Sequence, residues 1–107
     1  MNSIDMIAAE RRRQIEVEGY DTKHDLTHKP GDIALAGACY ACNASAWLGT
    51  NSFGELGKKY AELSQHGFRW PFEDKYWKPK NPLSDLVRAG ALIAAEIDRM
   101  LAESKKG

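Results

Sequence analysis

Apolar residues recur along three stretches of the chain at the spacing of an α-helix. The first stretch predicts a helix over residues 3–18, with Ser3 as its N-cap. The second, over 32–48, is alanine-rich and apolar on all sides, which is typical of a central, buried helix. The third, over 84–103, has Ser84 as its expected N-cap and a clear apolar stripe that we expect to face the core. This stripe consists of Leu86, Gly90, Ile93, Ile97, Met100 and Leu101.

The remaining stretches carry weaker patterns. Residues 55–65 predict one short amphipathic helix, whereas three prolines between 70 and 82 exclude a regular helix there. No useful alternation of apolar and polar residues indicates a β-strand. The predicted fold class is therefore all-α, a small helical bundle of three long helices plus one short helix and a Trp/Pro-rich loop. We expect a single domain over residues 1–107, with a fraying tail at 104–107.

Composition and charge limit the kinds of molecule that this chain is expected to bind. The chain of 107 residues has 15 Lys and Arg against 15 Asp and Glu, and this balance argues against general nucleic-acid or membrane-surface binding. No apolar run approaches the roughly 20 residues that a membrane span needs. Residues 1–5 lack the features of a secretion signal. We therefore expect a cytoplasmic protein.

Two cysteines form a CxxC motif, Cys39 and Cys42, and His24 and His28 lie upstream of it. Two histidines and two cysteines can in principle hold a zinc ion. The motif lies inside an alanine-rich helical run, however, and cysteine in such a position behaves as a small core residue. The pattern favours this second interpretation.

A charged residue interrupts the apolar face of the first predicted helix. Arg11 projects onto the same face as Ile7, and Glu18 joins it there. A charge on a core-facing stripe should be paired or should serve a site. Two alternatives follow for Arg11: an ion pair with a buried partner such as Glu18, or a position in a ligand cavity. Arg13 lies on another face, where we expect it to be solvated.

Carboxylates occur on all three predicted long helices, at Glu10, Asp32 and Asp85. If the helices pack together, such side chains can converge, and a cluster of oxygen ligands suits Mg²⁺ or Mn²⁺ that also holds substrate phosphates. The alternative is structural. Asp32 and Asp85 would then only cap their helices, and Glu96 would pair with Arg99.

Aromatic and basic residues alternate in the segment 70–80. Such rings can stack on a base while lysines neutralise phosphate. The candidates for nucleotide binding are Trp70, Trp77, Lys78 and Lys80. The alternative is that Trp70, Phe72 and Trp77 fasten a proline-rich loop onto the bundle.

Several segments together resemble small phage and prophage proteins. In those proteins an ER-x-RQ helix leads into a Gly-aromatic turn, a His/Asp-containing linker, an alanine-rich helix, Trp-Pro-Trp and Trp-Lys-Pro segments and a closing helix. The matching segments here are 9–15, 18–20, 24–25, 32–41, 70–72, 77–80, 85–93 and 95–97. The match covers most of the chain except roughly 45–67, which looks like a variable insert.

This phage group is similar in layout to the MazG-like all-α nucleoside triphosphate pyrophosphohydrolases. Those enzymes use Mg²⁺ held by helical carboxylates to split a nucleotide into its monophosphate and pyrophosphate, usually as dimers or higher oligomers. The resemblance implies a Mg²⁺-dependent (or Mn²⁺-dependent) hydrolase of a (deoxy)nucleoside triphosphate, with the metal among Glu10, Asp32 and Asp85. Glu10, Arg11 and Arg88 would be catalytic, the two arginines neutralising developing charge.

The second predicted helix departs from the enzymes in its carboxylates. It carries Asp32 alone, followed by apolar residues, where the enzymes carry an EExxE-type cluster. This motivates an alternative function: a catalytically inert, phage-derived module that binds a nucleotide or a host protein through the segment 70–80.

The last expectation concerns assembly. Three long helices leave the apolar second helix incompletely covered. We therefore expect a homodimer formed through the second and last helices across a two-fold axis. Their small residues, Gly37, Ala41, Gly90 and Ala94, would permit close crossing.

Overall fold

The computed structural model describes residues 1–50 and 70–105, and within these ranges the regular elements are all helical. The chain forms α1 (Ser3–Glu16), α2 (Thr22–Asp25), α3 (Asp32–Thr50), the 3₁₀ turn η1 (Asp74–Tyr76) and α5 (Pro82–Ser104). The predicted all-α class with three long helices is confirmed for this part of the chain.

Two predictions concern the stretch between α3 and η1. The short helix predicted at 55–65 and most of the predicted insert at 45–67 lie outside the described residues. The beginning of that insert, residues 45–50, continues α3 beyond the predicted end at 48. The linker 20–31, by contrast, contains the helical turn α2, which its polar sequence did not predict.

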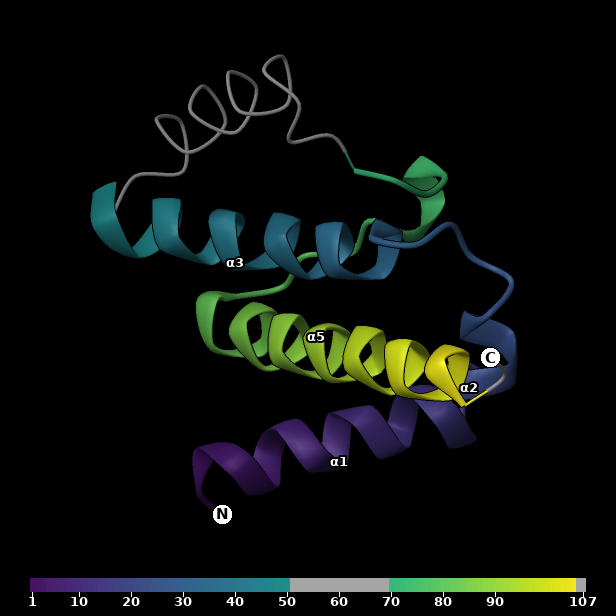
Figure 1. Ribbon diagram of the computed structural model, residues 1–107. Coiled ribbons are helices and arrows are strands. Elements are labelled where there is room, and N and C mark those ends of the chain that lie inside the picture. The colour runs from purple at the N-terminus through teal and green to yellow at the C-terminus, as the bar shows by residue number, and fades with distance from the viewer. Residues whose placement is uncertain (51–69, 106–107) are drawn as a thin grey trace.

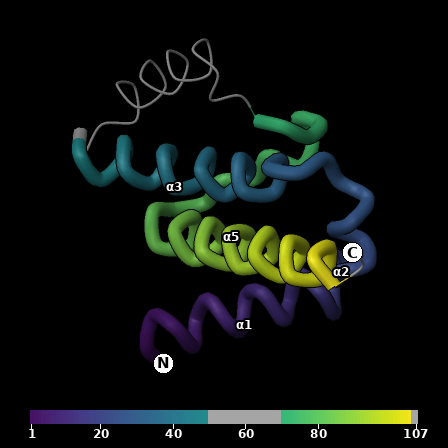
Figure 2. The backbone as a smooth tube through the Cα atoms, viewed as in Figure 1, coloured from purple at the N-terminus to yellow at the C-terminus, as the bar shows by residue number. Residues whose placement is uncertain are grey.

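Helix α5 lies between α3 and α1, as Figure 1 and Figure 2 show. It contacts α1, α2 and α3, so the central helix is α5 and the expectation that 32–48 would be central is wrong. Helices α3 and α5 run antiparallel, because the N-terminus of α3 meets Glu96 while Asn43 meets Asp85. No helix in the described ranges is both long enough and apolar enough to cross a membrane.

Helices α1 and α5 are capped by asparagines rather than by the predicted serines. The side chain of Asn2 accepts a hydrogen bond from the backbone N–H of Asp5 at 2.9 Å and caps α1. Asn81 caps α5 by accepting from the N–H of Ser84 at 2.9 Å, and Pro82 follows in the first turn. Asparagine caps as well as serine does, and a proline just inside a helix start needs no backbone N–H. The N-cap assignments to Ser3 and Ser84 are therefore wrong by one and three residues.

The side of α5 that packs against the other helices is small and polar. Its buried residues are Asp85, Ala89, Ala91, Ala95, Glu96 and Arg99. A Cβ atom at Gly37 of α3 would lie 3.1 Å from the carbonyl oxygen of Ala89, so the two helices are close and large side chains cannot lie between them. The predicted stripe, which includes Ile93 and Ile97, is largely exposed instead. The expectation that it faces the core is corrected.

Two of the four small residues expected to form a dimer contact, Gly37 and Gly90, pack within one chain. Gly37 packs on α5, and a Cβ atom at Gly90 would meet the side chain of Ile7 at 2.8 Å. The close helix crossings that these glycines permit are thus α3 on α5 and α1 on α5.

Candidate functional site

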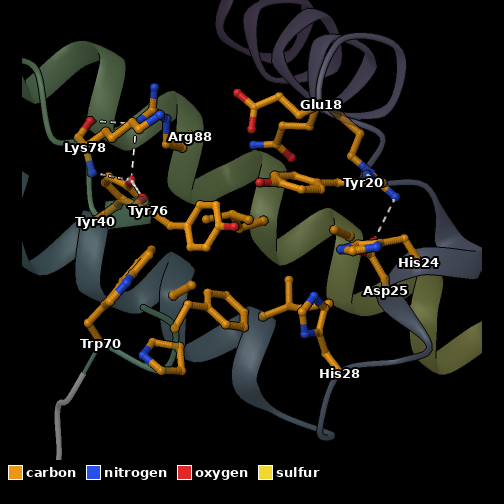
Figure 3. A pocket seen from close by; sticks show the side chains of 18 of the residues that line it. Glu18, Tyr20, His24, Asp25, His28, Tyr40, Trp70, Tyr76, Lys78 and Arg88 are labelled. Atoms are coloured by element: carbon orange, nitrogen blue, oxygen red, sulfur yellow. Dashed lines mark hydrogen bonds and ion pairs between the residues drawn. The ribbon is translucent and has the colours of Figure 1, made fainter. Parts of the chain in front are cut away.

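A cavity of about 750 Å³ opens among α1, α2, α3, α5 and the segment that carries η1. This volume falls in the range of about 300–1,000 Å³ in which small-molecule sites usually lie. Figure 3 shows Lys78, Tyr40 and Arg88 together at one side of the cavity and Tyr20, His24 and Asp25 at the other. Residues far apart in the sequence therefore line a single space.

Aromatic rings form much of the cavity wall. Tyr20 stacks on His24 with ring centroids 5.3 Å apart, and the ring centroids of His28 and Phe72 are 4.9 Å apart. On the opposite side, the ring of Trp70 lies 5.7 Å from that of Phe72 in an edge-on contact. These five side chains all line the cavity, so a flat apolar ligand would meet ring faces or edges over much of its surface.

The hydroxyl of Tyr40 joins α3, α5 and the segment after η1. It accepts hydrogen bonds from the backbone N–H of Lys78 at 3.1 Å and from Nη1 of Arg88 at 3.2 Å. Arg88 also donates to the carbonyl oxygen of Lys78 at 2.6 Å, and its guanidinium lies 5.1 Å from the centre of the Tyr40 ring. Tyr40 is buried, and its hydroxyl holds the guanidinium of Arg88 and the backbone of Lys78 at the edge of the cavity.

A second polar group lies on α1, around Glu10. Arg13 donates to Glu10 at 2.7 Å and to Glu18 at 2.9 Å, and Arg88 approaches Glu10 at 3.9 Å. Burial raises the pKa of Glu10, but the hydrogen bonds and charges of its partners, Arg13 first, outweigh burial, so its pKa lies below the usual value. Glu10 is therefore ionised at neutral pH and only accepts hydrogen bonds.

Arg11 combines the two roles that its sequence position left open. It lines the cavity, and its Nη2 atom lies 3.6 Å from Asp25 and 3.5 Å from Asp98. Its Nη1 atom donates to the carbonyl oxygen of Tyr20 at 2.9 Å. The buried ion-pair partner is Asp25 rather than Glu18. Burial raises the pKa of Asp25, and the charge of Arg11 offsets this effect only in part.

Among the described residues, three buried polar atoms on residues that line the cavity have no hydrogen-bond partner: Nε of Arg11, Oε1 of Gln14 and Oδ2 of Asp25. The orientation of the Gln14 amide follows from Glu10. Because Glu10 only accepts, the nitrogen of Gln14 must face it, at 3.1 Å, and Oε1 remains unpaired. A buried polar atom without a partner costs about 1–3 kcal/mol. Each of these atoms is itself buried, so their residues line the cavity through other atoms.

The three carboxylates predicted to hold a metal ion are not brought together. Glu10 is engaged by arginines, and Asp85 accepts from the N–H of Lys80 at 2.9 Å and from Asn43 at 3.1 Å. Asp32 begins α3 at the end next to Glu96, which is about 16 Å along α5 from Asp85 at 1.5 Å per residue. Within residues 1–50 and 70–105, no three His, Cys, Asp or Glu side chains form a group that could hold a metal ion. The described residues therefore do not fit the Mg²⁺ site that the resemblance implies.

The structural alternatives fit Glu96 and the cysteines, whereas the cap of α5 is Asn81 and not Asp85. Glu96 pairs with Arg99, as that alternative predicted, and also accepts from the N–H of Ala34 at 3.2 Å. Cys39 is buried and Cys42 is half-buried, and no disulfide joins them.

Of the four predicted nucleotide-binding residues, two line the cavity and two do not. Trp70 and Lys78 line the cavity. Trp77 packs against Tyr40 at 4.7 Å and Trp70 at 5.0 Å between ring centroids, and the backbone of Lys80 binds Asp85. Neither Trp77 nor Lys80 is among the residues that line it. The aromatic segment both packs onto α3 and supplies part of the wall.

Sequence reasoning missed several residues of the site. Arg13, which we expected to be solvated, binds Glu10 and Glu18 and lines the cavity. Its position three residues after Glu10 is a helical ion-pair spacing and could have identified it. Tyr20 and Tyr40 carried no comparable signal, because their neighbours at the cavity are distant in the sequence.

Comparison with protein-family models, with curated proteins and with solved structures found no match to this chain.

Proposed function

We propose that this protein binds a nucleotide in the cavity between α1, α3, α5 and the η1 segment. One observation carries the proposal: aromatic rings and basic side chains line the same cavity of about 750 Å³. A nucleotide needs both, because its base stacks on ring faces and its phosphates are neutralised by cations.

The arrangement of these groups gives the bound ligand a direction. Lys78 and Arg88 lie at one side of the cavity, and Tyr20 and His24 lie at the other (Figure 3). In this orientation the phosphates lie beside the two cations, and the base stacks toward Tyr20.

A fluorescence titration tests binding. Of the described tryptophans, Trp70 lines the cavity, so ribo- and deoxynucleoside triphosphates should change the tryptophan emission in a saturable way. Lys78→Ala should weaken binding about tenfold, on the order of one lost charge-assisted contact. Lys75→Ala is the matched control, because Lys75 lies on η1 outside the cavity lining and should leave affinity unchanged. Equal affinity for the wild type and Lys78→Ala would contradict the site.

The second candidate function is the pyrophosphohydrolase that the family resemblance implies. One observation favours it: two of the residues predicted as catalytic lie close together. Nε of Arg88 is 3.9 Å from Oε2 of Glu10, and Arg88 lines the cavity. Incubation with each common nucleotide and Mg²⁺ or Mn²⁺ tests it. Pyrophosphate release above the level of a Glu10→Gln variant would support hydrolysis, and release no higher than that of the variant would reject it while leaving the binding proposal intact.

A further inference from the structure

The charged side chains around the cavity nearly balance one another. Four cationic side chains and three acidic ones line it, so the wall has one net positive charge when the carboxyls are ionised and histidine is neutral at pH 7. These side chains are Arg11, Arg13, Lys78 and Arg88 against Glu18, Asp25 and Glu73. A nucleoside monophosphate carries about two negative charges near pH 7, and each further phosphoryl group adds about one more. The wall therefore offsets the charge of one phosphate group better than that of three.

Arg11 is bound at the side of the cavity where the base would stack. Its Nη2 atom lies 3.6 Å from Asp25, and its Nη1 atom donates to the carbonyl oxygen of Tyr20 at 2.9 Å. Figure 3 shows both partners at the side opposite Lys78 and Arg88. Arg11 is therefore not placed to neutralise phosphates that lie beside those two cations.

Charges alternate along the wall from Arg88 toward α1. Nε of Arg88 lies 3.9 Å from Glu10, and Nε of Arg13 donates to Glu10 at 2.7 Å. Nη1 of Arg13 in turn donates to Glu18 at 2.9 Å. A chain of phosphates that extended from Arg88 in this direction would meet two carboxylates and an arginine that both of them already bind. Further phosphoryl groups gain little there, because juxtaposed like charges repel.

Lys78 is the remaining cation of the wall. Among the described residues it is the only cationic side chain of the cavity lining that forms no ion pair. Its backbone is held by the hydroxyl of Tyr40 at 3.1 Å and by Nη1 of Arg88 at 2.6 Å. Lys78 and Arg88 therefore provide one place where a single phosphate group meets two cations.

We propose that the cavity recognises a nucleoside monophosphate, so that the first phosphoryl group adds affinity and further ones add none. This inference rests on the proposed nucleotide binding and specifies the class of nucleotide. It differs from the triphosphate substrate that the family resemblance implies.

A titration series tests the inference on the full chain. For each common base, the nucleoside and its mono-, di- and triphosphates are titrated against tryptophan emission in EDTA, which removes free divalent cations. We expect the monophosphate to bind about tenfold more tightly than the nucleoside, on the order of one charge-assisted contact, and the di- and triphosphates to bind no more tightly than the monophosphate.

The series separates failure of this inference from failure of the proposed function. Affinity that rises with each added phosphoryl group, or that is equal for the nucleoside and the monophosphate, would overturn the inference and leave nucleotide binding intact. No saturable change with any member of the series would overturn nucleotide binding itself, and the inference with it.

Glu18→Gln tests the effect of the wall charge. Removing this carboxylate should raise affinity for the triphosphate about threefold, and affinity for the monophosphate by less, because the additional phosphoryl groups lose a nearby like charge. Glu16→Gln is the matched control, since Glu16 ends α1, is exposed and lies outside the cavity lining, yet the variant changes the net charge equally. Equal triphosphate affinities for the two variants would contradict the charge argument.

Discussion

The chemistry of the cavity depends on a small number of buried polar side chains. Tyr40 is 2% exposed, yet its hydroxyl takes part in contacts with Lys78, Arg88 and the carbonyl oxygen of Tyr76. Glu10 performs a similar task for Arg13 and approaches Arg88. Tyr40 thus holds the guanidinium of Arg88, and Glu10 that of Arg13, which lowers the entropy lost when an anionic ligand binds.

Tyr40→Phe tests this positioning role. Removing the hydroxyl leaves the N–H of Lys78 without its acceptor, so the free energy of unfolding should fall by about 1–3 kcal/mol. Nucleotide affinity should fall as well, because Arg88 and the backbone of Lys78 each lose one of the contacts that position them. Tyr76→Phe is the control for stability. Tyr76 is 43% exposed, so the free energy of unfolding of this variant should change by less than about 0.5 kcal/mol. Urea unfolding and the fluorescence titration measure the two effects, and unchanged stability in Tyr40→Phe would contradict the role.

The carboxyl of Asp25 gives a prediction with a definite sign. Burial raises its pKa in the folded protein above the ordinary 3.8, so the folded state binds this proton more tightly than the unfolded state. The stability from this proton is fully present below the unfolded pKa and is lost as pH rises through the folded pKa. Relative to Asp25→Asn, the wild type should therefore become less stable as pH rises from about 4 through the folded pKa of Asp25. Urea unfolding at several pH values checks this, and a difference that moves the other way would show that the pairing with Arg11 dominates.

At the scale of the elements, the start of α3 is held by a side chain from another helix. Glu96 of α5 accepts from the N–H of Ala34, in the first turn of α3, and pairs with Arg99. Burial raises the pKa of Glu96, but the hydrogen bonds from Arg99 and from the α3 backbone outweigh it and lower the pKa. The contact links the start of α3 to α5 and so helps to set the distance across the cavity.

Glu96→Ala removes this contact. We expect a loss of about 1–2 kcal/mol in the free energy of unfolding, the usual value of a helix N-cap. Because the lowered pKa of Glu96 stabilises the fold above about pH 4.5, the loss should diminish as pH falls through the folded pKa. Glu103→Ala is the matched control, since Glu103 pairs with the same Arg99 but its side chain is 56% exposed, and exposed pairs contribute less than about 1 kcal/mol. Equal losses in the two variants would contradict the capping role.

The sequence predicted the elements of this fold better than their relations. Periodicity identified α1, α3 and α5 because each depends on neighbours three and four residues away. It could not show which face of α5 is covered, because both faces are plausible for a helix and the choice depends on the packing of Gly37 against Ala89. At the site, Arg11 was recognised because a charge on an apolar stripe is a local anomaly. The predicted metal site had no such local signal. Whether Glu10, Asp32 and Asp85 converge depends on helix register, which no local pattern contains.

At the scale of the whole molecule, two surfaces differ in chemistry. The cavity presents aromatic rings and cations on one side of α5, and exposed apolar side chains such as Ile93, Ile97 and Leu101 lie on the other side. A ligand of mixed aromatic and anionic character suits the first surface. Stabilisation by ligand should follow from the first alone, so nucleotides should raise the thermal midpoint in both the wild type and Ile97→Lys.

Mapping of amide chemical shifts by NMR during a nucleotide titration tests the central claim most directly. The proposal predicts saturable shifts at residues around the cavity, among them Tyr20, Trp70 and Arg88, and little change at Ile97 and Leu101. Shifts concentrated on the exposed side of α5 around Ile97 and Leu101, or none at millimolar nucleotide, would contradict nucleotide binding in this cavity.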